Sequence, residues 1–246
     1  MLSSLTAYVV CIVFVATLFR SALGFGEALV AVPLLALRLP IVIAAPLAVL
    51  VSVTVAAVVV AQDWRHVEVR SATGLIFSSL AGIPLGLLLL ARGNEHFVKS
   101  ILGALIVAFS LYSLTKRTMQ RLPDNHFGWL AGCGFLSGVL GGAYGMNGPP
   151  LAIYGALRGW SPQHFRATLQ GYFLAASVVG LIGYAAVGLW NQALMRYFLW
   201  SLPAIALAIV LGRAINQRMS GPGFFRFVYV GLIAVGVVLV AQAIMG

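Results

Sequence analysis

An arginine and a glutamate lie within one of the most apolar parts of the chain. Both belong to the stretch LFRSALGFGEALVAVPLL, and Glu27 is the one acidic residue of five with apolar sequence on both sides. Arg20 precedes it by seven residues, which would place both side chains on one face of an unbroken helix. An ionisable side chain at membrane depth normally faces a cavity or a partner. We therefore expect Arg20 to neutralise Glu27 or to bind an anion with its planar guanidinium.

Two other interpretations of this pair stay open from the sequence. Arg20 could end the first helix and extend its charge to the lipid headgroups, and Glu27 could lie at the membrane interface. If Glu27 lies at depth, it is a candidate proton carrier that couples flux to the proton gradient. Gly24 and Gly26 lie between the two charges, and we expect them to break the helix and to contribute to the same binding site.

A second glycine-rich stretch, GGAYGMNGPPLAIY, carries no charge. A half-helix that begins near Gly148 would present free backbone amides and its positive dipole end to an anion, and Pro149 suits the first turn of such a helix. Asn147 would orient the bound anion. The alternative is that the glycines only let helices pack closely in lipid.

The stretch HFRATLQGYF opens the next apolar segment and places Arg166 and Gln170 one turn apart on one face. Gln170 lies deeper and is the better candidate for a cavity residue, whereas Arg166 either binds substrate or anchors the helix at the interface. His164 is the one histidine with a candidate proton-transfer role. We find no spacing typical of a metal site, a cofactor site or a catalytic constellation, so we expect no metal, no cofactor and no enzymatic activity.

The elements that must position these residues are membrane helices. The chain of 246 residues is 61% hydrophobic and 8% charged, with a mean hydropathy of +1.03, which is typical of an integral membrane protein. Its net charge of +10 fits basic helix ends that contact lipid headgroups better than a nucleic acid partner. The apolar segments lie near residues 4–37, 41–61, 71–91, 97–115, 127–157, 167–189, 192–212 and 224–245.

We interpret these segments as one all-α, polytopic membrane domain, residues 1–246, with about eight transmembrane segments. It is divided into two similar four-helix halves at residues 1–122 and 123–246. The first segment of each half, residues 5–37 and 127–157, would be roughly 45–50 Å long if wholly helical. That length exceeds one crossing of about 30 Å and falls short of two crossings with a turn. We therefore expect each to be a full span followed by a half-helix or re-entrant arm, the arrangement that marks transporter binding sites.

The order of these motifs resembles the TauE/SafE family of sulfite and sulfonate exporters over essentially the whole chain. The resemblance rests on GFGEALVAVPLL and GFLSGVLGGAYGMNGPPLAIY as the two glycine-rich breaks, on FRATLQGYF after the second, and on DWRHVEVR and AGIPLG. Where members often have a run of glycines, this chain has Gly26, Glu27 and Ala28, so the first break is expected to bind differently.

The resemblance implies a multi-pass protein of the bacterial inner membrane that moves small sulfur-containing anions such as sulfite, sulfoacetate or another sulfonate. Our leading hypothesis is a secondary transporter, with proton-coupled export, whose site lies between the two breaks. The expected partners are the anion, protons and membrane lipid, with self-association left open. The alternatives are an anion channel and a substrate-sensing membrane subunit without net transport.

Overall fold

The computed structural model describes residues 4–23, 26–63, 69–115, 127–158 and 162–218, together with Ile233, Val237, Val240 and Ala241. Within these residues the chain forms nine α-helices and no strand, and seven of the helices are long and apolar enough to cross a membrane. The expected all-α membrane architecture is confirmed. The last predicted segment, 224–245, lies outside the described residues except for those four positions. The helices are α1 (Ser4–Leu23), α2 (Glu27–Ala36), α3 (Ile41–Asp63), α4 (Val69–Arg92), α5 (Glu95–Thr115), α6 (Phe127–Tyr144), α7 (Gly148–Leu157), α8 (Pro162–Ala186) and α9 (Gln192–Arg218).

Both long apolar segments are broken where the sequence predicts. The 20-residue α1 is followed by the 10-residue α2, and the 18-residue α6 is followed by the 10-residue α7. Gly26 and Gly145 have φ values of 92° and 68°, a left-handed conformation that favours glycine, so each break has a residue suited to the turn. Ten helical residues extend about 15 Å, half of the hydrocarbon core, which confirms a full span plus a half-helix in both places.

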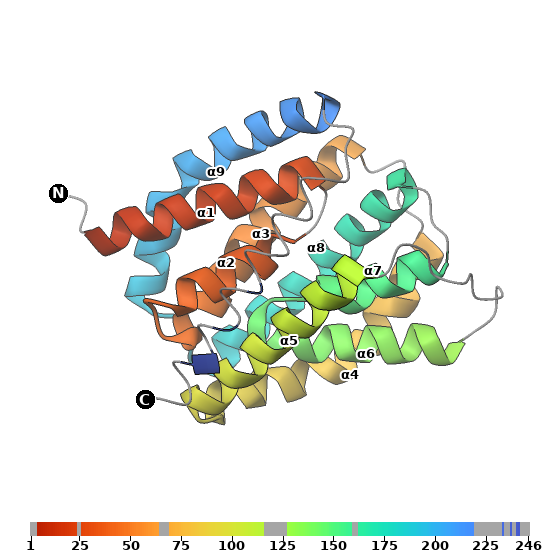
Figure 1. The fold of residues 1–246 in the computed structure, drawn as a ribbon, viewed down its shortest axis with the longest axis horizontal. Coiled ribbons are helices and arrows are strands. Elements are labelled where there is room, and N and C mark those ends of the chain that lie inside the picture. Colours follow the sequence, from red (N-terminus) through yellow and green to blue (C-terminus); the bar gives the residue numbers. More distant parts are fainter. Residues whose placement is uncertain are drawn as a thin grey trace.

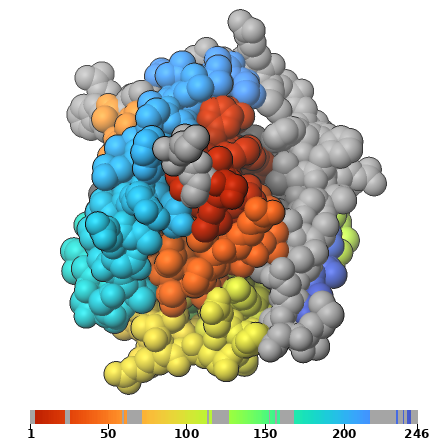
Figure 2. All heavy atoms as spheres, turned by 90° about the vertical axis from the view of Figure 1, so that its left-hand side faces the viewer, coloured from red at the N-terminus to blue at the C-terminus, as the bar shows by residue number. Residues whose placement is uncertain are grey.

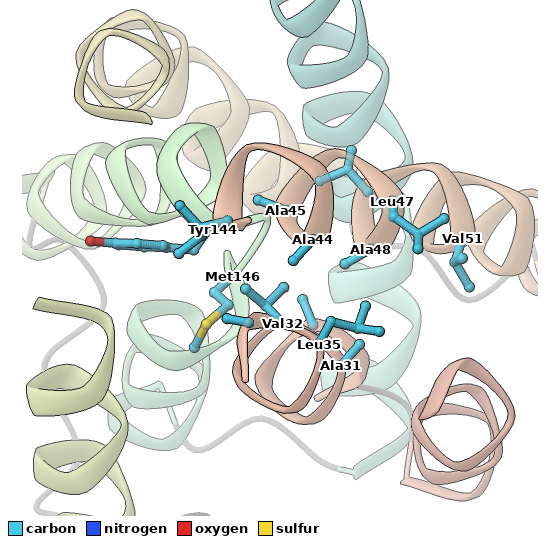
Figure 3. Packing of buried hydrophobic residues seen from close by; sticks show 14 of the residues in the cluster. Ala31, Val32, Leu35, Ala44, Ala45, Leu47, Ala48, Val51, Tyr144 and Met146 are labelled. Carbon is cyan, nitrogen blue, oxygen red and sulfur yellow. The ribbon is translucent and has the colours of Figure 1, made fainter. Parts of the chain in front are cut away.

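The half-helix α2 is part of the protein core. Nine of its ten residues are buried, which fits a helix that is apolar on all sides. Val32 and Leu35 of α2 face Ala44 and Ala48 of α3, and the small alanine side chains leave room for the two helices to approach (Figure 3). This packing fixes the position of the first break relative to α3.

Two long-range helix pairs organise the bundle. The first span α1 lies along α9, and α4 lies along α6 (Figure 1). A Cβ added at Gly138 of α6 would lie 2.2 Å from the carbonyl oxygen of Ser79, and one added at Gly86 of α4 would lie 2.1 Å from that of Val139. The α4 and α6 backbones therefore touch. At the other pair, a Cβ at Gly212 of α9 would lie 2.4 Å from Cβ of Ser21 on α1.

The outer surface of the bundle is apolar. Figure 2 shows α1 (red) between α9 (blue) and the orange region of α2 and α3, with α5 (yellow) at the lower edge of that face. Large apolar side chains are exposed on the long helices, with Phe77, Phe127 and Val210 at 73%, 77% and 67%. Exposed apolar side chains on many helices are expected where lipid covers the protein.

Candidate functional site

Arg20 and Glu27 form a buried ion pair across the first break. Nη1 of Arg20 lies 2.7 Å from Oε2 of Glu27, and the two side chains are 3% and 2% exposed. The helix is interrupted between them, yet the turn at Gly26 keeps them together. The predicted pairing is confirmed, and the alternative in which Arg20 extends to the headgroups is wrong, because its charge is neutralised inside the bundle.

The Arg20 guanidinium connects four helices. Besides Glu27 of α2, Nη1 donates to Oγ of Ser52 on α3 at 2.6 Å, and Nη2 donates to Oε1 of Gln170 on α8 at 2.8 Å. The ring of Phe173 lies under the guanidinium at 5.3 Å from its centroid, a cation–π contact. Nε of Arg20 is buried without a hydrogen-bond partner. The Nε–H group of this buried cation therefore has no acceptor.

The amino end of α2 adds further donors next to this pair. The first helical bond runs from Val30 N–H to Gly26 O, and no side chain caps the helix start. The amides of Glu27, Ala28 and Leu29 consequently have no acceptor within the helix, and the positive end of the helix dipole lies here. The Glu27 carboxylate also accepts a hydrogen bond of 3.1 Å from Thr17 on Oε1. The first break thus combines a cation, an anion and a helix amino terminus.

The second break is neutral and held by hydroxyl groups. Asn147 is buried, and its backbone carbonyl oxygen accepts a hydrogen bond of 2.6 Å from Ser137. Tyr172 donates to Ser137 at 3.2 Å, and its hydroxyl group lies near the Asn147 side chain. Gly141 makes room for that side chain, since an added Cβ would lie 2.4 Å from Oδ1 of Asn147. These contacts fix Asn147 without any charged group.

The half-helix α7 begins at Gly148 as the sequence predicts, but it offers fewer amides than we expected. The residues of its first turn include Pro149 and Pro150, which have no N–H group. Only Gly148 and Leu151 bring amides to this turn. The contribution of α7 to anion binding is therefore mainly its dipole and the Gly148 amide.

A small cavity lies where the two breaks meet, and we call it the central cavity. It measures about 30 Å³, which is room for one or two water molecules and too little for a sulfonate. Charged and polar side chains reach it from α1, α2, α3 and α8. Its lining includes Arg20, Gly26, Glu27, Ser52, Asn147, Gly148, Pro149, Phe173 and Ser177.

Most of the predicted site residues converge on this cavity. Six of them line it, and Gln170 binds Arg20 directly. Gly24 lies outside the described residues, and Arg166 and His164 belong to α8 with side chains that are not described. Their predicted roles remain predictions.

Sequence reasoning missed four residues of the site. Phe173 and Ser177 follow Gln170 at spacings of three and seven, so the helix period of α8 could have identified them. Thr17 precedes Arg20 by three residues on α1 in the same way. Ser52 gave no signal beyond a hydroxyl in an apolar helix, because its partner Arg20 is 32 residues away.

Among the residues that the structure describes, no group of three or more His, Cys, Asp or Glu side chains is placed to hold a metal ion. Another ion pair joins Lys99 to Glu95 at 3.0 Å, on the surface of α5. Arg20 and Glu27 are consequently the charged side chains that line the central cavity.

Comparison with known proteins gives two matches. The family model described as sulfite exporter TauE/SafE matches residues 9–239. A protein named "Probable sulfite/organosulfonate exporter TauE" from Cupriavidus necator is 25% identical over 240 residues, which covers 93% of this chain and 91% of that protein. No solved structure matches.

Proposed function

This chain belongs to the sulfite exporter TauE/SafE family, and from that premise we propose that it is a secondary transporter that exports small sulfur-containing anions. Like its family, it is a multi-pass membrane protein. The relative from Cupriavidus necator carries a name that includes sulfite and organosulfonate, and we extend that substrate class to this chain. We place the protein in the bacterial inner membrane and assign it transport without chemical conversion.

The observation that carries the proposal is the convergence of both breaks on Arg20. The amino ends of α2 and α7 line the central cavity together with this guanidinium. Helix amino ends bind anions through amides and dipole, and a planar guanidinium matches the oxygens of an oxyanion. Arg20, Gly26, Gly148 and Asn147 would hold the oxygens, while Gln170 keeps Arg20 in place. Because the central cavity measures only about 30 Å³, the Glu27 carboxylate would have to move away from Arg20 to make room for the anion.

Glu27 would supply the coupling to protons. Its carboxylate occupies the Arg20 position that an incoming anion needs, so two negative groups compete for one cation. When the anion takes over Arg20, a protonated Glu27 removes the remaining buried negative charge. Binding of the anion and uptake of a proton are thereby linked, and acid favours anion binding at the site. Because the anion and the proton would then cross together, against an inward proton gradient, the outward gradient of the anion itself would drive export.

We also propose that the two halves are structural repeats. The first span of each half, α1 or α6, lies along the third span of the other half, α9 or α4. These third spans each contain an internal proline, Pro84 in α4 and Pro203 in α9. Each half thus begins with a broken helix and packs its third span against the first span of the other half. These two features support a pair of repeats that interlock around one site.

Counterflow of labelled methanesulfonate in proteoliposomes tests transport. We expect label to accumulate transiently in vesicles preloaded with unlabelled methanesulfonate and not in protein-free vesicles. The matched control is Arg92→Gln, because Arg92 is an exposed arginine at the end of α4. Normal counterflow in this variant with none in Arg20→Gln supports the proposal. Absence of counterflow in the wild-type protein, or linear flux without saturation, would overturn it.

The role of Glu27 has its own test in the same vesicles. Sulfonates stay ionised near neutral pH, so any pH dependence of methanesulfonate binding belongs to the protein. We expect the apparent affinity of the wild-type protein to rise as the pH falls, and Glu27→Gln to bind equally well across the range. A Glu27→Gln protein with the wild-type pH profile would exclude Glu27 as the proton carrier.

A further inference from the structure

A second, larger cavity lies beside the central cavity, and we call it the apolar cavity. It measures about 400 Å³ and lies between α5, α6 and α7. Its wall is almost entirely carbon, with no charged side chain. Its lining includes Leu105, Ala108, Cys133, Leu136 and Ile153.

The two cavities are contiguous. Leu29 of α2, Phe109 of α5, Met146 of the second break and Pro149 of α7 line both of them. Figure 3 shows Met146 next to Val32, at the side of α2. Methionine is unbranched and adaptable, so it can yield to a chain that passes from one cavity to the other. The polar space around Arg20 is therefore separated from an apolar space only by side chains that line both.

We propose that this protein carries sulfonates with an apolar carbon chain, with the sulfonate group at Arg20 and the chain in the apolar cavity. The inference rests on the proposed function and narrows its substrate class. The charged head of such a molecule matches Arg20 and the helix amino ends beside it. The apolar tail matches the carbon-lined wall of the apolar cavity. A small hydrophilic sulfonate would leave the larger of the two spaces unused.

The arrangement fits an anionic amphiphile better than a lipid acyl chain. The apolar cavity reaches the outer surface at α6, where Trp129 and Leu136 of its wall are 49% and 54% exposed. An acyl chain that enters from this side would bring its terminal methyl group to the buried Arg20 and Glu27 pair. A sulfonate brings its charge there and leaves only carbon in the apolar cavity, so each end meets a matching environment.

The energetic consequence is a dependence of affinity on chain length. Each methylene that moves from water into an apolar cavity is expected to raise affinity about three- to fourfold. Methanesulfonate would fill the head site alone. Propanesulfonate and hexanesulfonate would progressively occupy the apolar cavity.

The test measures how these three sulfonates inhibit counterflow of labelled methanesulfonate. For the wild-type protein we expect hexanesulfonate to inhibit at concentrations at least a hundredfold lower than methanesulfonate. In Ala108→Trp, which fills the apolar cavity from α5, we expect that advantage to shrink at least tenfold while methanesulfonate inhibition changes less than twofold. The matched control is Ala104→Trp, one turn earlier on α5, exposed and outside both cavities.

A second filling variant, Cys133→Phe, approaches from α6 and keeps the inference testable if Ala108→Trp does not fold. Equal inhibition by all three sulfonates in the wild-type protein would overturn the inference and leave the proposed function intact, and lipid in the apolar cavity would produce this result. An equal loss of the hexanesulfonate advantage in Ala108→Trp and Ala104→Trp would also overturn it, because the loss would then be a general effect of a tryptophan on α5. An advantage that stays unchanged in both variants would overturn it too, because it would reflect partition into the bilayer. If methanesulfonate itself gives no counterflow, the proposed function fails and the inference fails with it.

Discussion

Between α1 and α2 the chain carries a buried ion pair, whereas between α6 and α7 it carries only amide and hydroxyl groups. Both breaks have the same backbone plan, with a glycine of positive φ followed by a ten-residue helix. The first break adds Arg20 and Glu27 at 2.7 Å. The second adds Asn147, whose backbone carbonyl oxygen accepts a hydrogen bond from Ser137, which in turn accepts one from Tyr172. The two breaks therefore share a backbone conformation, whereas only the first break carries charged side chains.

This difference indicates a division of roles. A buried ion pair is weak evidence for stability, because desolvation offsets much of the attraction between the charges. The presence of this ion pair in the first break is better explained if another anion can replace the Glu27 carboxylate at Arg20. The neutral second break would act as a rigid wall that completes the site.

The largest effect is expected from Arg20→Gln. The substitution leaves the Glu27 carboxylate buried without a cation, which we expect to lower the free energy of unfolding by about 3–5 kcal/mol and to abolish counterflow. The stability loss should be smaller at acidic pH, where a protonated Glu27 needs no countercharge. Unfolding in mixed micelles at two pH values, together with counterflow, measures both effects.

The double variant Arg20→Gln/Glu27→Gln separates folding from function. With both charges removed, most of the stability should return while counterflow stays absent. Recovery of transport in the double variant would show that the first break serves the fold alone, and the contrast between the two breaks would lose its functional meaning.

A somewhat smaller effect is expected at the helix crossing behind the second break. Gly138→Ala would drive a Cβ against the Ser79 carbonyl oxygen at 2.2 Å, and we expect it to lower the free energy of unfolding by about 3 kcal/mol. The matched control is Gly132→Ala on the same helix, where an added Cβ meets nothing within 4 Å. Equal unfolding free energies of the two variants would contradict the close contact of α4 and α6.

The sequence predicted the breaks because glycine and proline act locally. It raised the Arg20 and Glu27 pair as one of several alternatives, from a spacing of seven that places two side chains on one face of an unbroken helix. The helix is broken between them, and the pair forms because α2 turns back at Gly26. The sequence did not identify Ser52, whose role depends on how α3 packs against α1. The glycines had two roles that sequence alone does not separate: Gly145 forms the turn and Gly138 allows the crossing of α4 and α6. The missing amides of Pro149 and Pro150 were visible in the sequence.

Gln170→Leu tests how much the first break depends on the hydrogen bond between Arg20 and α8. The substitution removes the acceptor at 2.8 Å from Nη2 of Arg20, and a hydrogen bond to a charged group contributes about 2 kcal/mol. We expect a comparable loss in the free energy of unfolding and a reduced apparent affinity for methanesulfonate. An affinity equal to that of the wild-type protein would mean that Arg20 needs no support from α8.

Asn147→Ala gives the corresponding measurement for the second break. It removes a buried neutral amide that lies near Tyr172 and Gly141, so the expected loss is about 1 kcal/mol. Methanesulfonate binding should weaken less than in Gln170→Leu. A larger loss of binding in Asn147→Ala than in Gln170→Leu would reverse the roles that we assign to the two breaks.

The most direct test is a structure of the protein with bound 2-bromoethanesulfonate, in which the bromine marks the ligand by anomalous scattering. We expect the sulfonate oxygens within hydrogen-bonding distance of the Arg20 guanidinium, next to the amino ends of α2 and α7, with the Glu27 carboxylate displaced from Arg20. A structure in which the ligand lies elsewhere and the 2.7 Å contact of Arg20 with Glu27 persists would contradict the account.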